Sequence, residues 1–458
     1  MHTRMLISAS WLLALCSSVS VVCRSVAAEE LRAESPNFVF IMADDLGWAD
    51  VQFHGGTVPT PHLNQLAAGG VELTQHYVAP LCTPTRTGLL SGRFWSRFGV
   101  TKPQNPRALP QQTMTLPRAL KTVGYRTCLV GKWHLGSDPV DGPQKFDFDS
   151  SYGSLAGGVG PWNHRYKQGP FSETWHRDGQ LIEETGHVTD LLCAEAVKWI
   201  TTSPADVPFL LYVPLTAVHL PIREPAEWLA KVPAEIKGDV GRHYAACIMH
   251  LDDTVGRIVK ALEQTGRRDQ TLLVFTSDNG GSTAENCDLK YPEDDYPEGP
   301  LTGSNQPLRG QKGQLFEGGI RVPTVVSWPG RLPPGKLAVP AHICDWMPTF
   351  CRLAEAVDGR ELKWDGQDLW PILTGQATRR TSPLYWVAPE FQSRAVRQGD
   401  WKLIEDNSGK SAVYLLFDLA TDPYEQSDVA AGQPEQLQRM QQLLQEISRD
   451  DQRRGAGE

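Results

Sequence analysis

Four short, largely apolar runs, each followed closely by polar or charged residues, constrain the fold of this chain more than any other feature. They span residues 38–42, 126–130, 209–213 and 272–275. Amphipathic, helix-like segments separate them, and this alternation is typical of an α/β domain with a mainly parallel sheet. The helical candidates are 61–68, 116–123, 187–201, 243–264 and 433–449.

The polar residues that follow the four runs form one predicted site. Ligands bind beyond the carboxyl ends of the strands in open α/β sheets, so side chains that follow parallel strands are expected to share one edge. In chain order these residues are Asp44, Asp45, Lys132, His134, His219, Asp278 and Asn279.

The aspartates and the asparagine of this set predict a metal site. Carboxylates brought together without a cation repel one another, whereas carboxylate and amide oxygens are suitable ligands for a hard divalent metal. Taken alone, residues 277–281 fit a tight turn equally well. Asp44 and Asp45 alone would also fit a strand end or a helix cap. The metal interpretation depends on the motifs that accompany them.

Cys82 opens the most distinctive motif of the chain. Residues 82–93 read Cys-Thr-Pro-Thr-Arg-Thr-Gly-Leu-Leu-Ser-Gly-Arg. A cysteine at the start of a helix, with Pro84 in the first turn and Arg86 four positions on, is placed to be a reactive centre. A buried free cysteine is commonly structural, however, and one such pentapeptide can occur by chance. The other motifs decide between these interpretations.

Motifs along the whole chain resemble, in order, those of one enzyme family. Cys-x-Pro-x-Arg at 82–86 resembles the sulfatase signature that directs oxidation of the cysteine to formylglycine, and 124–134 resemble the second sulfatase signature. Residues 308–323 are similar to the block with the family's last active-site lysine, and 394–404 resemble its closing hairpin. The chain thus resembles the formylglycine-dependent type I sulfatases of the alkaline phosphatase superfamily, with motifs closest to arylsulfatase B and related N-acetylgalactosamine sulfatases.

The resemblance implies a fold, a reaction and cofactors. The fold is a large, mainly parallel sheet sandwiched by helices, as in alkaline phosphatase, with a small C-terminal antiparallel sheet and a helix. The reaction is hydrolysis of sulfate monoesters, expected here to be O-sulfated carbohydrates. The cofactors are Ca²⁺, with Mg²⁺ as the alternative, and a formylglycine that a maturase makes from Cys82. The implied metal ligands are Asp44, Asp45, residue 82, Asp278 and Asn279.

The resemblance also implies the catalytic roles. A hydroxyl of the formylglycine hydrate attacks sulfur near the metal, and the hydrate then collapses to an aldehyde and expels sulfate. His134 assists that collapse, and His219 protonates the leaving oxygen. Lys132 and Lys312 neutralise sulfate oxygens, and Arg86 holds the diol and the metal-side carboxylates. Lysines are usually solvated, and a lone loop histidine such as His219 is commonly structural.

Two segments bear on the substrate. Residues 152–175 include Trp162, His164 and Arg165, which suit stacking on a sugar ring and pairing with a second acidic group. The same composition also fits a packing loop. The acidic stretch 288–300 would repel densely sulfated polymers if it overhung the pocket. That arrangement would favour a sparsely sulfated glycan or a mono-sulfated sugar.

Residues 1–28 have the pattern of a secretory signal, with Arg4, an apolar run and small residues at the end. The apolar run is too short for a comfortable transmembrane span, and we expect no transmembrane segment in the mature chain. We therefore expect export to the periplasm or the extracellular space, or a lysosomal or secreted protein in a eukaryote.

We expect two structural parts after the signal, a sulfatase catalytic domain over 29–380 and a C-terminal subdomain over 381–458. Strand-like runs at 384–387, 393–404 and 412–419, followed by a polar helix, predict the second part.

Cysteine usage and charge add two expectations. Six cysteines besides Cys16, Cys23 and Cys82 permit disulfides in an export compartment. Cys344 and Cys351, however, lie about 10 Å apart along a helix predicted at 343–356 and are expected to be free. The net charge of −9 and the lack of a basic stripe argue against nucleic-acid binding.

Three other functions stay open at this point. The nearest is a phosphate or phosphonate monoester hydrolase with the same formylglycine nucleophile. The second is a non-catalytic glycan-binding relative. The third is a cysteine-nucleophile hydrolase, for which the metal cluster would have no purpose.

Overall fold

The computed structural model describes residues 35–287, 291, 295–356 and 362–452. The predicted signal segment 1–28 and most of the acidic part of 288–300 lie outside the described residues.

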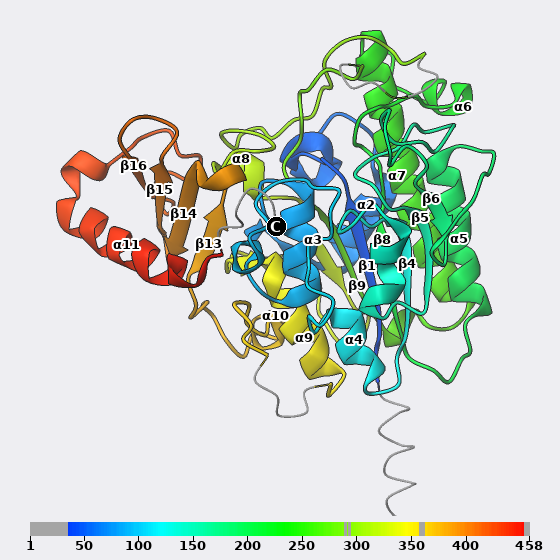
Figure 1. The fold of residues 1–458 in the computed structure, drawn as a ribbon, viewed down its shortest axis with the longest axis horizontal. Helices are drawn as coiled ribbons and strands as arrows, with labels where there is room; N and C mark the ends of the chain where they lie inside the picture. Colours follow the sequence, from blue (N-terminus) through cyan, green and yellow to red (C-terminus); the bar gives the residue numbers. More distant parts are fainter. Residues whose placement is uncertain (1–34, 288–290, 292–294, 357–361, 453–458) are drawn as a thin grey trace, which may run out of the picture.

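One large sheet forms the centre of the molecule (Figure 1). Within the described residues it has ten strands in the order β11-β2-β10-β9-β1-β8-β4-β5-β6-β7. The central strands β9, β1, β8, β4 and β5 are parallel, whereas β10 and β6 join antiparallel at the two sides. The bounds are β1 (Asn37–Ala43), β2 (Val71–Leu73), β4 (Arg126–Lys132), β5 (Ser150–Ser154), β6 (Trp175–Arg177), β7 (Gln180–Leu181), β8 (Phe209–Pro214), β9 (Thr271–Ser277), β10 (Val325–Ser327) and β11 (Gly335–Leu337).

All four apolar runs are strands of this sheet, which confirms the predicted fold class. The full register of β1 pairs Asn37–Ala43 with Thr271–Ser277 of β9, so the ends of these two strands are level with each other. Buried Val, Ile and Phe side chains make β1 a strand with both faces covered.

Helices cover both faces of the sheet, and the alternation of β1 shows which cover which. Phe38, Phe40 and Met42 belong to a core cluster with side chains of α3, α4 and α9, whereas Val39, Ile41 and Ala43 belong to a second cluster with α2, α5 and α7. The helices are α2 (Pro61–Gly69), α3 (Cys82–Ser91), α4 (Leu116–Lys121), α5 (Val188–Thr202), α6 (Ala226–Leu229), α7 (Asp239–Gln264), α8 (Glu317–Ile320), α9 (Trp346–Leu353), α10 (Trp370–Leu373) and α11 (Pro434–Ile447).

A second, antiparallel sheet lies to one side of the main body (Figure 1). Its strands, in spatial and chain order, are β13 (Leu384–Val387), β14 (Ser393–Gln398), β15 (Trp401–Asp406) and β16 (Val413–Asp418), and α11 contacts β14 and β15. A two-stranded sheet pairs β3 (His76–Tyr77) with β12 (Ala341–His342). The predicted antiparallel sheet and final helix are thereby confirmed, and the domain boundary at residue 381 stays a prediction.

A buried ion cluster joins the C-terminal sheet to the catalytic part. Lys402 of β15 donates to Glu317 of α8 over 2.9 Å and lies 2.7 Å from Glu425, with all three side chains fully buried or nearly so. Tyr77 donates to the other oxygen of Glu317 over 2.7 Å. These contacts give Glu317 a structural role.

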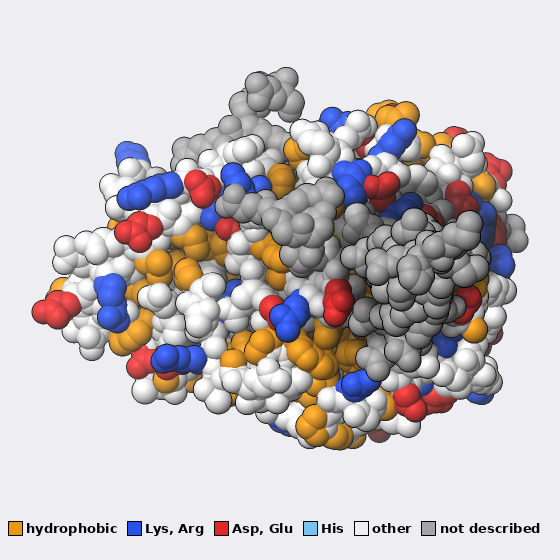
Figure 2. Space-filling model, turned by 90° about the horizontal axis from the view of Figure 1, so that it is seen from below, with side chains coloured by type: hydrophobic (Ala, Val, Ile, Leu, Met, Phe, Trp, Pro, Cys, Tyr) orange, Lys and Arg blue, Asp and Glu red, His pale blue; other side chains and the backbone are white. Residues whose placement is uncertain are grey.

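Each cysteine in the described part of the chain is free, including Cys344 and Cys351 as predicted. Among the described helices, none has the length and apolar character needed to cross a bilayer. On the face shown in Figure 2, acidic and basic side chains are interspersed around a hydrophobic area.

Candidate functional site

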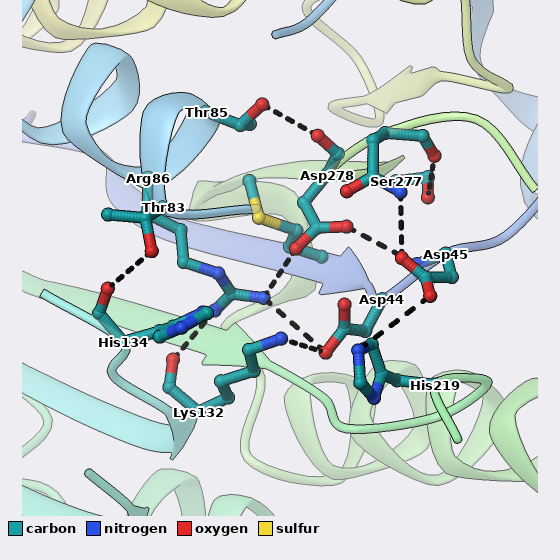
Figure 3. Close-up of polar contacts among 12 residues, drawn as sticks. Asp44, Asp45, Thr83, Thr85, Arg86, Lys132, His134, His219, Ser277 and Asp278 are labelled. Atoms are coloured by element: carbon teal, nitrogen blue, oxygen red, sulfur yellow. Dashed lines mark hydrogen bonds and ion pairs between the residues drawn. The ribbon is translucent and has the colours of Figure 1, made fainter. Parts of the chain in front are cut away.

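The acidic residues of the predicted site meet where β1 and β9 end (Figure 3). Asp44 and Asp45 follow β1, and Asp278 and Asn279 follow β9. The Asp278 N–H donates to the Ala43 carbonyl over 3.0 Å, and the Asp45 N–H donates to Asp278 Oδ1 over 3.2 Å. All four side chains are fully buried. Parallel register thus brings together residues that lie more than two hundred positions apart.

Hydrogen bonds within the two turns fix the direction of these side chains. Ser277 Oγ accepts from the Leu46 N–H over 3.0 Å and donates to the Asn279 carbonyl over 2.9 Å. The Asn279 amide donates to Asp45 Oδ1 over 2.7 Å. Asp45 has a φ of 64°, a left-handed conformation that lets the chain turn sharply at the strand end.

Cys82 is the first residue of α3 and is 2% exposed. Pro84 is tolerated there because N–H groups of the first helical turn have no partner within the helix. Thr83 donates to the His134 carbonyl over 3.1 Å, and Thr85 donates to the Asp278 carbonyl over 2.6 Å. These two hydroxyls hold the start of α3 against the ends of β4 and β9.

Burial raises the pKa of the Cys82 thiol above its ordinary value, although Lys132 and Lys312 oppose the shift. An unmodified cysteine at this position is therefore a poor nucleophile at neutral pH, because the thiolate is the reactive form.

Arg86 lies across the base of the site (Figure 3). Its guanidinium donates to Asp278 Oδ2 over 2.8 Å and to the Lys132 carbonyl over 2.7 Å, and it lies 3.9 Å from Asp44. Its side chain is completely buried. A fixed planar cation in this position holds two carboxylates in one arrangement.

Each predicted lysine pairs with one aspartate. Lys132 Nζ donates to Asp44 Oδ2 over 2.5 Å, and Lys312 Nζ donates to Asp45 Oδ2 over 2.6 Å. Burial alone would lower the pKa of both amines, but the paired carboxylates raise it. Lys132 is fully buried and Lys312 is 18% exposed, so neither is a solvated surface lysine.

Close glycine packing brings Lys312 to the site. Its N–H donates to the Gly281 carbonyl over 3.2 Å, and the Gly280 N–H donates to the Gly319 carbonyl over 3.0 Å. A Cβ on Gly280 would lie 1.9 Å from the Gly318 carbonyl oxygen. Glycine is therefore required where the turn after β9 meets the segment around α8.

The two predicted histidines lie on opposite sides of the site. His219 Nε2 is 3.8 Å from Asp45 Oδ2, and its Nδ1 is 2.5 Å from the Leu220 carbonyl oxygen, which it can reach only as a donor. His134 Nδ1 is buried without a hydrogen-bond partner. Burial, followed by the nearby lysines, holds the pKa of both rings well below the ordinary value. Both are neutral near pH 7.

The acidic residues fit a hard divalent cation. Ligand atoms of Asp44, Cys82 and Asp278 lie within 4.8 Å of one another. Asp44 Oδ1 and Asn279 Oδ1 are buried without a partner, and such atoms are costly unless something binds them. Burial and repulsion from Asp278 raise the pKa of Asp44 to about 8, which is the strain that a cation would relieve.

The three predicted substrate residues differ in position. Trp162 is 44% exposed and donates through Nε1 to the Arg223 carbonyl over 3.1 Å. Arg165 is also exposed, with Glu183 3.5 Å away. His164 is buried, stacks on Trp175 at 4.7 Å and bonds to the Gly186 carbonyl. This geometry favours a packing role for His164, whereas Trp162 and Arg165 stay predictions for substrate contact.

Gly157 and Tyr166 also lie near the site. Gly157 carried no sequence signal of its own, whereas Tyr166 belongs to the aromatic segment 152–175 that the sequence indicated for sugar stacking. A Cβ on Gly157 would lie 2.4 Å from His134 Nε2, so this glycine lets the chain pass directly over the ring. Tyr166 lies close enough to Lys132 and Cys82 for their charges to act on its pKa. Both belong to the loop after β5, whose path depends on tertiary packing.

Comparison with known proteins gives a consistent result. The family model described as "Sulfatase" matches residues 36–356. Mouse arylsulfatase J is 29% identical over 90% of this chain and 76% of its own length. Mouse N-acetylgalactosamine-6-sulfatase is 32% identical over 77% of this chain and 69% of its own length.

Solved structures with the same fold include two informative neighbours. Ps i-CgsB in complex with k-i-k-neocarrahexaose has a TM-score of 0.82 and 30% identity, and the match covers 92% of this chain and 94% of that one. The phosphonate monoester hydrolase of Agrobacterium radiobacter has a TM-score of 0.61 at 19% identity, over 90% of this chain and 95% of that one. The second likeness concerns the fold alone.

Proposed function

The chain belongs to the sulfatase family and is a sulfuric ester hydrolase, and from this premise we propose that it removes sulfate from a sulfated carbohydrate by means of a formylglycine made from Cys82. The observation that carries the proposal is the convergence, around one buried cysteine at a helix start, of two paired lysines and two neutral histidines.

The nucleophile in this proposal is a hydrate of the oxidised side chain at position 82. One hydroxyl of the hydrate loses its proton, and its oxygen forms a bond to sulfur while the bond from sulfur to the alcohol oxygen breaks and that oxygen takes up a proton. The second hydroxyl then loses its proton, the carbon–oxygen bond to sulfate breaks, and the aldehyde returns. Water regenerates the hydrate. A serine could complete only the first of these steps, because it has no second hydroxyl from which an aldehyde could form.

The neutral histidines divide the proton transfers. His219 Nδ1 donates to the Leu220 carbonyl, so the neutral ring carries no proton on Nε2. Nε2 would first take up a proton from solvent, with the Asp45 carboxylate 3.8 Å away to stabilise the imidazolium, and then pass that proton to the leaving oxygen. His134 approaches residue 82 from the end of β4, and its unpartnered Nδ1 can accept the proton of the second hydroxyl. Lys132 and Lys312 would balance the charge that grows on the sulfate oxygens.

Asp44, Asp45, Asp278, Asn279 and residue 82 would hold Ca²⁺, or Mg²⁺ as the alternative. A bound divalent ion would act as a Lewis acid toward a sulfate oxygen and favour the ionised hydroxyl. Arg86 and Lys132 keep Asp44 and Asp278 in place for it.

A glycan substrate is supported by the relatives. One relative is named N-acetylgalactosamine-6-sulfatase, and one solved neighbour was crystallised in complex with k-i-k-neocarrahexaose. Trp162, exposed near the loop that carries His219, offers a flat apolar surface for a sugar ring. We propose export as well, on the signal pattern of residues 1–28, with a formylglycine-generating maturase as partner.

Mass spectrometry of the peptide that contains Cys82 tests the nucleophile. Protein made together with an active maturase should carry the aldehyde, and a free thiol there would refute the mechanism. Kinetics on p-nitrophenyl sulfate and p-nitrophenyl phosphate test the bond that is cleaved. A larger kcat/KM for the phosphate would favour a phosphate or phosphonate hydrolase, and intact ligand in both cases would favour a glycan-binding relative.

A further inference from the structure

A second cluster of metal-ligating side chains lies outside the proposed sulfate site. His187 precedes α5, Glu224 lies in the loop after β8, and His250 lies in the middle of α7. All three are buried, and their ligand atoms lie within 4.8 Å of one another. The reaction described above uses none of them.

Contacts within this cluster centre on the Glu224 carboxylate. His250 Nδ1 is 2.8 Å from Glu224 Oε2, and His187 Nε2 is 3.5 Å from Glu224 Oε1. Two ligand atoms on a tetrahedral Zn²⁺ lie about 3.3 Å apart. The separation between His187 and Glu224 therefore already suits such an ion. The distance between His250 Nδ1 and Glu224 Oε2 would lengthen by about half an ångström when the ion displaces the proton between these two atoms.

His187 Nε2 is the independent sign of a missing ligand. It is buried, belongs to a side chain that is 1% exposed, and has no hydrogen-bond partner. A ring nitrogen left in this state inside a protein is costly. Ligation through Nε2 would put the ring proton on Nδ1. Nδ1 now accepts a long, 3.4 Å hydrogen bond from the Thr189 N–H, which ligation would break, and the Arg223 carbonyl also interacts with the ring.

Cys247 lies beside the cluster. It precedes His250 by three positions on α7, and its buried thiol interacts with the Glu224 carboxylate. The ligand atoms that lie within 4.8 Å of one another are those of His187, Glu224 and His250. Two imidazoles and a carboxylate, with a fourth position open to water, are a ligand set that proteins use for tetrahedral Zn²⁺.

Outer contacts already orient the His250 ring. Its Nε2 is 3.2 Å from Asp190 Oδ1, and Trp228 stacks on it at 4.6 Å. A histidine that ligates a metal through one nitrogen usually donates from the other to a carboxylate. The Asp190 contact places the proton on Nε2 and directs the Nδ1 lone pair to Glu224.

We propose that His187, Glu224 and His250 bind a Zn²⁺-class ion that holds the loop after β8 against α5 and α7. His187, Glu224 and Cys247 line a cavity of about 20 Å³ together with His219, and that volume admits one water-sized particle. His219 and Glu224 are five residues apart on this loop. The ion thereby positions the loop from which His219 reaches the sulfate site.

The competing arrangement is a proton in place of the metal. Burial alone would lower the pKa of His250, but hydrogen bonds to Asp190 and Glu224 raise it to about 9. An imidazolium between two carboxylates satisfies His250 and leaves His187 Nε2 unpartnered. Metal analysis separates the two arrangements.

The experiment uses the full chain with Asp278→Ala, which removes a ligand of the proposed sulfate-site metal. After incubation with Zn²⁺ and desalting, this protein should retain about one zinc per chain. Adding Glu224→Gln or His187→Gln should lower the zinc content at least tenfold. The matched control His62→Gln, at an exposed helix position, should leave it unchanged.

Two further measurements keep the proposal testable if a variant fails to fold. Thermal melting of the Asp278→Ala protein should shift upward on addition of Zn²⁺, because a ligand that binds only the folded state stabilises it. Co²⁺ should give the visible absorption of a tetrahedral complex, lost in His187→Gln and kept in the control His62→Gln. Folded Asp278→Ala protein that retains no zinc and melts at the same temperature with and without it overturns the proposal.

Discussion

Substitution of Gly157 by alanine isolates the positioning of His134. A Cβ at residue 157 would lie 2.4 Å from His134 Nε2 and 2.5 Å from Cε1, whereas ordinary contacts begin at 3.4 Å. The ring or the loop must therefore move by about 1 Å, and a misplacement of this size near reacting atoms lowers a rate by about 100-fold. Overpacking of the same contact should cost about 1–3 kcal/mol of stability.

The assay is kcat and KM on p-nitrophenyl sulfate, normalised to the fraction of formylglycine measured by mass spectrometry. We expect the loss in kcat, with KM changed little, because the three atoms nearest to a Cβ at residue 157 all belong to His134. Gly69→Ala is the matched control, since a Cβ there meets nothing within 4 Å. It should leave kcat unchanged.

A double-mutant cycle decides whether the effect passes through His134. In a His134→Ala background the ring is gone, so Gly157→Ala should cost little further activity. An equal loss in both backgrounds, or activity of the single variant within threefold of the parent at equal formylglycine content, would refute the reasoning.

Three more predictions concern the metal, the nucleophile and the joined sheets. Asp278→Ala should abolish sulfatase activity and metal binding at the sulfate site together, as judged by turnover and calcium content; surviving turnover contradicts the metal assignment. Cys82→Ser should release about one alcohol per chain and then stop, and sustained turnover would remove the need for an aldehyde. Lys402→Met should lower the free energy of unfolding by about 3–5 kcal/mol because it removes the buried cation that pairs with both Glu317 and Glu425; urea unfolding that matches the parent would contradict it.

The elements of the fold could be predicted well because their signals are local. Each apolar run ends within two residues of a strand end, and the predicted start of the helix at Cys82 agrees with α3. Errors occur at boundaries. The helix expected over 343–356 is a short 3₁₀ turn followed by Trp346–Leu353, and α7 begins at Asp239, four residues before the predicted start.

The positions of residues that are held by distant partners could not be predicted from the sequence. His164 is held against Trp175 of β6 and the Gly186 carbonyl, and no spacing in the chain announces those contacts. The His187, Glu224 and His250 cluster draws on three separate elements, with no motif that links them. Gly157 matters only because the His134 ring lies against it.

The residue pattern of the chain specifies which functional groups can lie together at one edge of the sheet. Apolar periodicity specifies parallel strands, parallel strands end at one edge, and the residues after them carry the acids, lysines and histidines that sulfate chemistry needs. How these groups meet depends on the tertiary structure. Three features of the site arise from burial and distance. Lys132 pairs with Asp44 and Lys312 with Asp45. Both histidines are neutral, and an oxygen of Asp44 and one of Asn279 have no partner. Those quantities depend on packing between segments far apart in the chain, which local residue patterns do not encode.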